Sequence, residues 1–227
     1  MKIAIISDAH GNLLFFKFCM EAIQKEKVDR IVALGDYFGY MLDGKKVFDI
    51  LRDNNAILLK GNHEAMLLGE LPLDKKKDEL YNLSIIRKRL SKNFLKILRD
   101  IPLKYELSID GLKILFIHGS PHDCLSGYIY EDNINDSLAK CTKEYDYIFM
   151  GHTHRPFQKK KGSTAFVNVG SCGLPRDCGL MPSFCLFDTK IRTCTIVRVN
   201  IDSGVLKRKE YTQLNSIVFE VFLRGEI

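Results

Sequence analysis

The chain has 227 residues, of which 46% are hydrophobic and 27% are charged, a composition typical of a globular protein with its own core. No apolar run approaches membrane-spanning length, so we do not expect a membrane protein. The apolar stretch between Met1 and Asp8 is too short for a signal peptide. The seven cysteines form no Cys-x-x-Cys pair, so we expect reduced thiols and a cytoplasmic location rather than a disulfide framework.

Five short apolar runs predict buried strands. Each is rich in β-branched or other apolar residues and is bounded by polar or turn-forming residues, a pattern typical of strands buried in an α/β sheet. The runs are Ile3–Ile6, Ile31–Leu34, Ile57–Leu59, Ile114–Ile117 and Tyr147–Met150.

Helices are expected between the first strands. Apolar residues recur at helical spacing from Asn12 to Lys27 and from Asp43 to Arg52, which predicts two helices that return the chain to the next strand. The same spacing from Lys76 to Asp100 predicts one long helix or two helices, ended by Pro102.

The second half of the chain is richer in strands. A hairpin is expected where Lys104–Ile109 and Leu112–Ile117 flank Asp110-Gly111, because Asp-Gly is a favoured two-residue turn. Ala165–Val169, Ser183–Phe187 and Thr193–Asn200 predict further strands. No linker or repeat interrupts the chain, so we expect an α/β fold with a single domain over residues 1–227.

The densely apolar C-terminal segment, from Asn200 to Ile227, allows two interpretations. It is either a packed terminal helix or a subunit contact. We expect packing, because apolar residues are most often buried within their own chain.

The residues that end the five apolar runs have side chains able to bind a metal. They are Asp8, His10, Asp36, Asn62, His63, His118, His152 and His154. Ligand sites of α/β sheets lie beyond the carboxyl ends of the strands, so we expect these side chains at one edge. Imidazole, carboxylate and amide ligands without thiolate suit Mn, Fe, Zn, Co or Ni. The set is too large for one ion and suits two that share a carboxylate.

Five sequence blocks in this order resemble the calcineurin-like metallophosphoesterase superfamily. The blocks are Asp8-Ala9-His10, Gly35-Asp36, Gly61-Asn62-His63-Glu64, His118 and Gly151-His152-Thr153-His154. Further phrases are similar to its small prokaryotic phosphodiesterase branch: His118-Gly119-Ser120-Pro121, Asn168-Val169-Gly170-Ser171 and Cys172-Gly173-Leu174-Pro175-Arg176-Asp177. The resemblance implies two facing mixed β-sheets flanked by helices, a four-layer sandwich. It also implies hydrolysis of phosphate esters by a hydroxide that bridges two divalent ions, with Mn favoured.

The resemblance also implies a role for each residue. Asp8, His10 and His154 would hold the first metal, and Asn62, His118 and His152 the second, as their positions in the blocks suggest. Asp36 would bridge the two ions. His63 would face the substrate and protonate the leaving oxygen.

The substrate is the harder question. Phosphoprotein phosphatases of this superfamily carry an Asp-Arg-Gly-type sequence soon after the bridging Asp, whereas this chain has Tyr37 and Phe38 after Asp36. The glutamate that follows His63, Glu64, is in contrast a feature that resembles the phosphatase branch. We therefore expect a phosphodiester or nucleotide first and a phosphomonoester or phosphoprotein second. The competing class is a non-catalytic scaffold, although every ligand position holds a competent residue.

Features outside the five blocks are weaker signals. The net charge of +6 favours anionic substrates, and the lysine clusters are compatible with nucleic acid binding only if the fold gathers them on one surface. Asn12 is expected to cap the following helix. For His122 and Arg155 a substrate contact and a surface position are both open, and Cys124 is expected to be a structural thiol.

Overall fold

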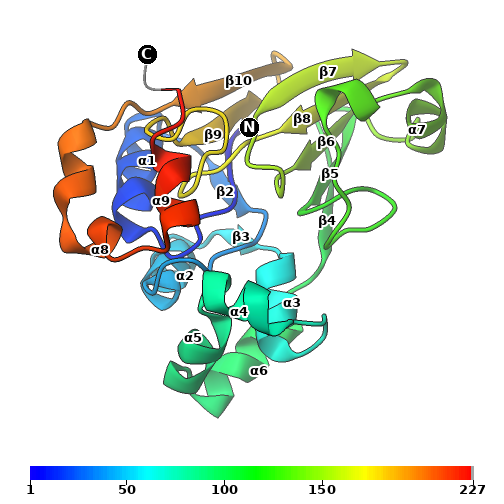
Figure 1. Cartoon of the computed structure of the whole chain (residues 1–227). Helices are drawn as coiled ribbons and strands as arrows, with labels where there is room; N and C mark the ends of the chain where they lie inside the picture. The colour runs from blue at the N-terminus through cyan, green and yellow to red at the C-terminus, as the bar shows by residue number, and fades with distance from the viewer. Residues whose placement is uncertain (226–227) are drawn as a thin grey trace.

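The computed structural model describes residues 1–225 and contains two five-stranded mixed β-sheets (Figure 1). The first sheet has the order β10-β9-β1-β2-β3, in which β1, β2 and β3 are parallel and β9 and β10 run antiparallel to their neighbours. Its strands are β1 (Lys2–Ile6), β2 (Arg30–Ala33), β3 (Ile57–Leu58), β9 (Ser183–Asp188) and β10 (Thr193–Arg198).

The second sheet has the order β4-β5-β6-β8-β7, with β5, β6 and β8 parallel and an antiparallel strand at each edge. Its strands are β4 (Lys104–Ile109), β5 (Leu112–Ile117), β6 (Tyr147–Met150), β7 (Phe157–Lys161) and β8 (Thr164–Asn168). The predicted hairpin of β4 and β5 is confirmed, and its turn residues Asp110 and Gly111 both have positive φ.

Side chains along each strand point alternately to the two faces of the sheet, so each sheet has one apolar face that packs against the other sheet. Ile3 and Ile5 of β1 point into a core between the sheets, together with Ile114 and Phe116 of β5. Ala4 and Ile6, with the opposite orientation, pack against helices on the outer face of the first sheet. The predicted fold class, two mixed sheets flanked by helices, is confirmed.

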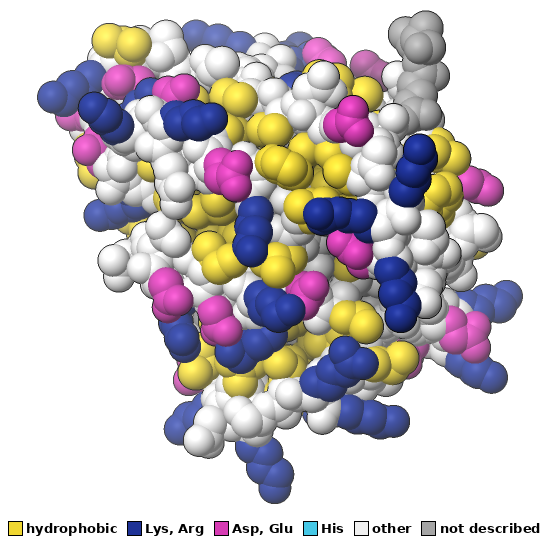
Figure 2. All heavy atoms as spheres, turned by 90° about the vertical axis from the view of Figure 1, so that its left-hand side faces the viewer, with side chains coloured by type: hydrophobic (Ala, Val, Ile, Leu, Met, Phe, Trp, Pro, Cys, Tyr) yellow, Lys and Arg dark blue, Asp and Glu magenta, His cyan; other side chains and the backbone are white. Residues whose placement is uncertain are grey.

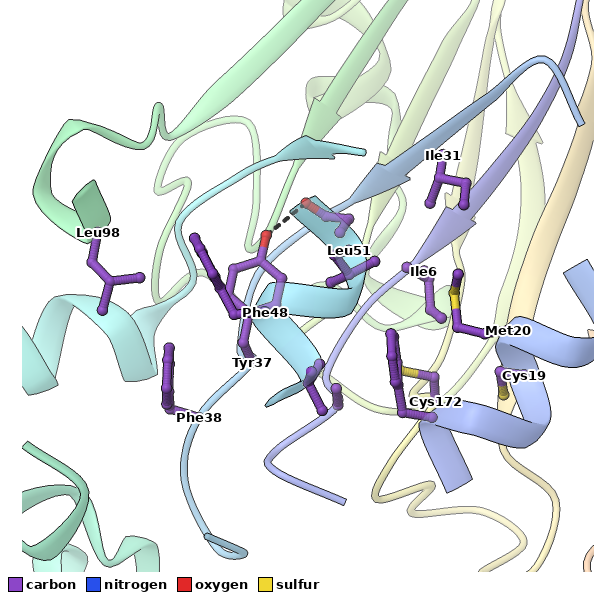
Figure 3. Packing of buried hydrophobic residues seen from close by; sticks show 14 of the residues in the cluster. Ile6, Cys19, Met20, Ile31, Tyr37, Phe38, Phe48, Leu51, Leu98 and Cys172 are labelled. Atoms are coloured by element: carbon purple, nitrogen blue, oxygen red, sulfur yellow. Dashed lines mark hydrogen bonds between the residues drawn. The ribbon is translucent and has the colours of Figure 1, made fainter. Parts of the chain in front are cut away.

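Helices α1 (Leu13–Lys25) and α2 (Gly44–Asp53) cover the outer face of the first sheet, where both were predicted. Figure 3 shows Ile6 and Ile31 of the sheet facing Cys19 and Met20 of α1. As predicted, Asn12 caps α1, because its side chain accepts a hydrogen bond from the backbone N–H of Phe15. The outer face of the second sheet packs against α7 (Asp136–Cys141) and the segment before it.

The helical segment predicted from Lys76 to Asp100 is three short helices, not one or two. They are α4 (Lys75–Tyr81), α5 (Leu83–Arg89) and α6 (Lys92–Asp100), and they follow α3 (Asn62–Leu68), which the sequence did not predict. The first break falls at Asn82, whose φ of 59° lies in the left-handed region. Its side-chain amide donates a hydrogen bond to the carbonyl of Tyr40, so a tertiary contact interrupts the helical pattern.

The C-terminal segment packs on α1 over its described residues 200–225, as expected, and residues 226–227 lie outside the described residues. It contains one 3₁₀ helix (Ser203–Lys207) and the helices α8 (Lys209–Thr212) and α9 (Ser216–Phe222), and Tyr211, Val218 and Phe222 share a hydrophobic cluster with Phe15. Figure 2 shows this face, with hydrophobic side chains near its middle and Lys and Arg around them. A hollow of about 880 Å³ lies here between α1, the segment after Tyr40 and α8.

Among residues 1–225, no helix combines the length and the apolar character that a membrane-spanning segment needs.

Candidate metal centre

All eight predicted site residues lie together at the carboxyl ends of the strands. Asp8 and His10 follow β1, Asp36 follows β2, and Asn62 and His63 begin α3 after β3. His118 follows β5, and His152 and His154 follow β6. All are buried except Asn62, which is partly exposed. The two sheets therefore contribute to one site.

The first donor group consists of Asp8, His10 and His154, whose ligand atoms lie within 4.8 Å of one another. Nε2 of His154 is 3.3 Å from Oδ1 of Asp8, and Nε2 of His10 is 3.0 Å from Nε2 of His154. The other ring nitrogens are held by backbone carbonyls, Nδ1 of His10 by Phe38 at 3.1 Å and Nδ1 of His154 by Leu174 at 2.6 Å. These contacts aim both Nε2 atoms at the same point, as for metal-binding histidines.

The second donor group consists of Asp36, His118 and His152, again within 4.8 Å. Nε2 of His118 is 3.4 Å from Oδ2 of Asp36 and 2.9 Å from Oδ1 of Asn62. The amide oxygen of Asn62 thus lies beside this group, where the resemblance placed it.

Asp36 lies between the two groups. Its Oδ2 is 3.4 Å from Nε2 of His118 and 3.7 Å from Nε2 of His10. Its Oδ1 accepts the backbone N–H of His63 at 2.9 Å, which fixes the plane of the carboxylate. Burial alone would raise the pKa of Asp36, but His118 and His63 hold it well below its ordinary value. In turn, despite burial, Asp36 raises the pKa of His118 to about 9.

The unsatisfied atoms of the site fit a metal pair. Oδ1 of Asp8 in the first group and Nε2 of His152 in the second are buried and have no hydrogen-bond partner among the described residues. A buried polar atom without a partner is costly. Nδ1 of His10 and of His154 each face a carbonyl oxygen, so in neutral imidazoles, which have one N–H, the two Nε2 atoms that face each other are both acceptors and cannot bond to each other. Divalent cations would satisfy all of these atoms, and nitrogen and carboxylate donors without thiolate suit transition metals.

The backbone at the site is strained. Five predicted ligands, none of them glycine, have φ in the left-handed region. They are Asp8 (57°), His10 (49°), Asp36 (56°), His152 (65°) and His154 (58°). This conformation costs free energy for residues other than glycine and persists where the surroundings enforce it, which is common at functional sites.

Glu64 holds part of this strained backbone in place. Its Oε2 accepts the N–H groups of Asp36 at 2.8 Å and Gly61 at 2.9 Å, and its Oε1 accepts those of Tyr37 at 2.9 Å and Phe38 at 3.3 Å. Burial and the nearby Asp36 raise the pKa of Glu64 to about 7. Sequence reasoning had connected this residue only with the phosphatase branch. The structure shows that it positions the loop that carries Asp36.

His63 lies beside both donor groups, and with His10 and Asp36 it forms a third set of possible ligands, whose ligand atoms lie within 4.8 Å of one another. Its Nε2 is 3.9 Å from Oδ2 of Asp36, and its ring contacts the rings of His10, Tyr40 and Tyr81. Gly39 leaves room for it: a Cβ on Gly39, which has a φ of 98°, would lie 2.1 Å from Nδ1 of His63. Burial lowers the pKa of His63 well below its ordinary value, against the effect of Asp36.

The structure separates the weaker candidates from residues that sequence reasoning missed. His122 and Arg155 are exposed, and neither belongs to a donor group. Tyr40, Tyr128 and Arg176 adjoin the site instead. Of these three residues, only Arg176 lies in a motif that carried the family resemblance, Leu174-Pro175-Arg176-Asp177, and that motif indicated no role for it.

The fold and the site together define a metal-dependent phosphoesterase family. A family model for the calcineurin-like phosphoesterase superfamily domain matches residues 1–192, and the chain belongs to that superfamily, as the five blocks predicted.

Its relatives include two proteins of Methanocaldococcus jannaschii. One, MJ0912, is 32% identical over 217 residues, which cover 88% of each chain. The other, named Phosphodiesterase MJ0936, is 24% identical over 193 residues, or 84% of this chain and 94% of that protein. The crystal structure of hypothetical protein PH1004 from Pyrococcus horikoshii OT3 matches with a TM-score of 0.84 and 18% identity, over 99% of this chain and 98% of that one.

Proposed function

We propose that this protein hydrolyses phosphate esters, with phosphodiesters or nucleotides as its substrates, and that it uses two divalent metal ions, Mn favoured. The observation that carries the proposal is the position of Asp36 between the two donor groups, with His63 beside both. Asp8, His10 and His154 would hold one ion, and Asn62, His118 and His152 the other. The name of the relative Phosphodiesterase MJ0936 supports the choice of reaction.

When bound, such an ion pair would neutralise the charge of a phosphoryl group and lower the pKa of the attacking water toward ~7. The chain's own residues supply the rest of the chemistry. Asp36, fixed through the N–H of His63, sets the spacing of the two donor groups. We assign His63 the role of giving a proton to the leaving oxygen as the P–O bond breaks, a contribution typically worth ~10²–10⁴ in rate. Because burial lowers the pKa of His63, this role requires the negative charge of the bound phosphate to favour the protonated imidazole.

The residues after Asp36 argue against a phosphoprotein substrate. Tyr37 and Phe38 point into the hydrophobic core, where Figure 3 shows them near Phe48 and Leu98. The hydroxyl of Tyr37 donates its one proton to the carbonyl of Leu59 at 2.8 Å, and the carbonyl of Ala33 lies 3.1 Å away. Neither side chain is free to grip a phosphate, and Glu64 is engaged with backbone N–H groups.

The test is hydrolysis by the protein loaded in turn with Mn, Fe, Zn, Co and Ni. We expect kcat/KM for bis-p-nitrophenyl phosphate to exceed that for p-nitrophenyl phosphate and for phosphopeptides under the same metal. A clear advantage for phosphopeptides would place the protein with the phosphatases, the second candidate. Inactivity on every ester with every metal would favour the alternative that the protein is a non-catalytic scaffold.

A further inference from the structure

Arg176 lies beside the candidate metal centre without a carboxylate partner. Its guanidinium is mostly buried, and it takes part in none of the ion pairs among the described residues. The neighbouring carboxylate, Asp177, is paired with Arg198 instead. Burial lowers the pKa of a guanidinium, but Tyr40, Tyr128 and Asp8 together raise that of Arg176, so it keeps its charge. A largely buried cation without an anion is costly, and an anionic ligand would offset this cost.

Arg176 contacts the surroundings of the first donor group and of His63. Its backbone N–H donates to the carbonyl of His154 at 3.2 Å, and its Nη2 donates to the hydroxyl of Tyr40 at 3.2 Å. The ring of Tyr40 packs edge-on against His10 and stacks on His63. The Tyr40 contact therefore orients the guanidinium beside the first donor group and the proposed acid.

Tyr128 flanks Arg176 next to the second donor group. Its ring centroid is 4.0 Å from that of His152. Burial raises the pKa of the Tyr128 hydroxyl, and the positive charge of Arg176 opposes this rise. A tyrosine therefore packs against each donor group, Tyr40 against His10 and Tyr128 against His152, and Tyr40 accepts a hydrogen bond from Arg176.

Tyr128 and Tyr130 present parallel aromatic rings to the solvent. Their side chains are 52% and 43% exposed, and the ring centroids are 6.2 Å apart at an angle of 10°. Ile129, between them, is buried in a cluster with Ile117 and Met150, which anchors the segment. Exposed aromatic rings held in this way can stack on a flat ligand, and a nucleobase is a flat ligand that any aromatic side chain can accept.

From these contacts we infer that the substrate is a nucleoside phosphodiester. Arg176 binds a non-bridging oxygen of its phosphate, and the Tyr128–Tyr130 pair binds its base. Guanidinium groups suit phosphate because their N–H groups match its oxygens. The inference rests on the proposed function and deepens it by naming the part of the substrate that is not cleaved.

Two diesters with the same leaving group test the base contact. They are thymidine 5′-(p-nitrophenyl phosphate) and methyl p-nitrophenyl phosphate, which differ only in the nucleoside. We expect Tyr128→Ala to lower kcat/KM about tenfold for the thymidine ester, mainly through KM, because stacking on an aromatic side chain is worth ~1–3 kcal/mol per base. The methyl ester should change less than about twofold, and Tyr128→Phe, which keeps the ring, should behave as wild type.

Arg176 is tested with the same pair. We expect Arg176→Ala to lower kcat/KM at least tenfold for both esters and Arg176→Lys to recover part of the loss, because a lysine keeps the charge but not the fork of donors. Arg155→Ala is the matched control, since Arg155 is exposed and close in sequence to His154. It should leave both rates unchanged. Metal content and thermal unfolding of each variant show that its fold and metal site are intact.

Calorimetric binding separates this inference from the proposed function. We expect thymidine 5′-monophosphate to bind the Mn-loaded protein more tightly than methyl phosphate, and Tyr128→Ala to remove the difference. Equal binding of the two monoesters, or an equal loss of rate on both diesters in Tyr128→Ala, would overturn the base contact. Unchanged rates in Arg176→Ala would overturn the phosphate contact. Failure of the wild type to hydrolyse any ester would contradict the proposed function, and the binding comparison would still decide whether the Tyr128–Tyr130 pair binds a base.

Discussion

The substitution Phe222→Ala removes the aromatic ring by which the C-terminal helix is anchored. Phe222 is 0% exposed, and its ring makes edge-to-face contacts with Phe15 and Tyr211, each at a centroid distance of 5.4 Å. Burial of such a side chain is worth about 1.5–3 kcal/mol, and each aromatic pair adds about 0.5–1.5 kcal/mol. The sum of about 2.5–6 kcal/mol agrees with the about 3–5 kcal/mol typical of Phe→Ala in a core.

A loss of about 4 kcal/mol should lower the Tm by about 8–16 °C in a chain of this size. The assay is thermal unfolding followed by circular dichroism. Leu223→Ala is the matched control, because Leu223 is the next residue and is 43% exposed, so its substitution should change the Tm by no more than about 2 °C.

The same measurement tests the prediction of a single domain. If residues 1–227 form one cooperative unit, Phe222→Ala should unfold in one transition at the lower Tm. A Tm shift no larger than that of Leu223→Ala would refute the packing argument. A separate early transition would instead show that the C-terminal segment unfolds on its own.

Three further predictions concern the metal centre. Asp36→Asn should reduce the occupancy of both metal sites, whereas His152→Ala should weaken mainly one, and metal analysis with two fully occupied sites in Asp36→Asn would rule out a bridging carboxylate. His63→Ala should keep both metals and lose ~10²–10⁴ in rate on alkyl esters but less on nitrophenyl esters, whose leaving group needs no proton. Equal losses of rate on both kinds of ester would exclude His63 as the general acid. Gly39→Ala should mimic His63→Ala, because the added Cβ would lie 2.1 Å from Nδ1 of His63, and normal alkyl ester turnover would contradict this.

The candidate ligands could be predicted from sequence because each follows a strand directly. Ile3–Ile6 and Ile114–Ile117 are recognisable as buried strands from their composition alone, and the strand fixes where Asp8 and His118 emerge. Parallel strands align their carboxyl ends, so residues that directly follow such strands can be predicted to lie together at one edge of the sheet. The division of the strands into two facing mixed sheets, in contrast, depended on the family resemblance.

The residues around the ligands could not be predicted in the same way. Tyr128 and Arg176 lie in irregular segments without periodic spacing, and their positions follow from tertiary contacts. The helical prediction over residues 76–100 was inexact for a similar reason, since Asn82 leaves the helical conformation to donate to the carbonyl of Tyr40. In each case a partner far away in the sequence decides the local structure.

Tyr40 shows how these contacts combine at the site. It has a φ of 61°, a strained conformation that is held by hydrogen bonds of its N–H with the carbonyl of Tyr81 and of its carbonyl with Asn82. From this position the ring stacks on His63 and the hydroxyl accepts from Arg176. The proposed acid and the proposed phosphate-binding arginine are therefore oriented by one residue, whose conformation depends on the turn between α4 and α5. The break between α4 and α5 therefore supports the site, because a continuous helix through Asn82 would remove the hydrogen bond from the Asn82 side chain to the carbonyl of Tyr40.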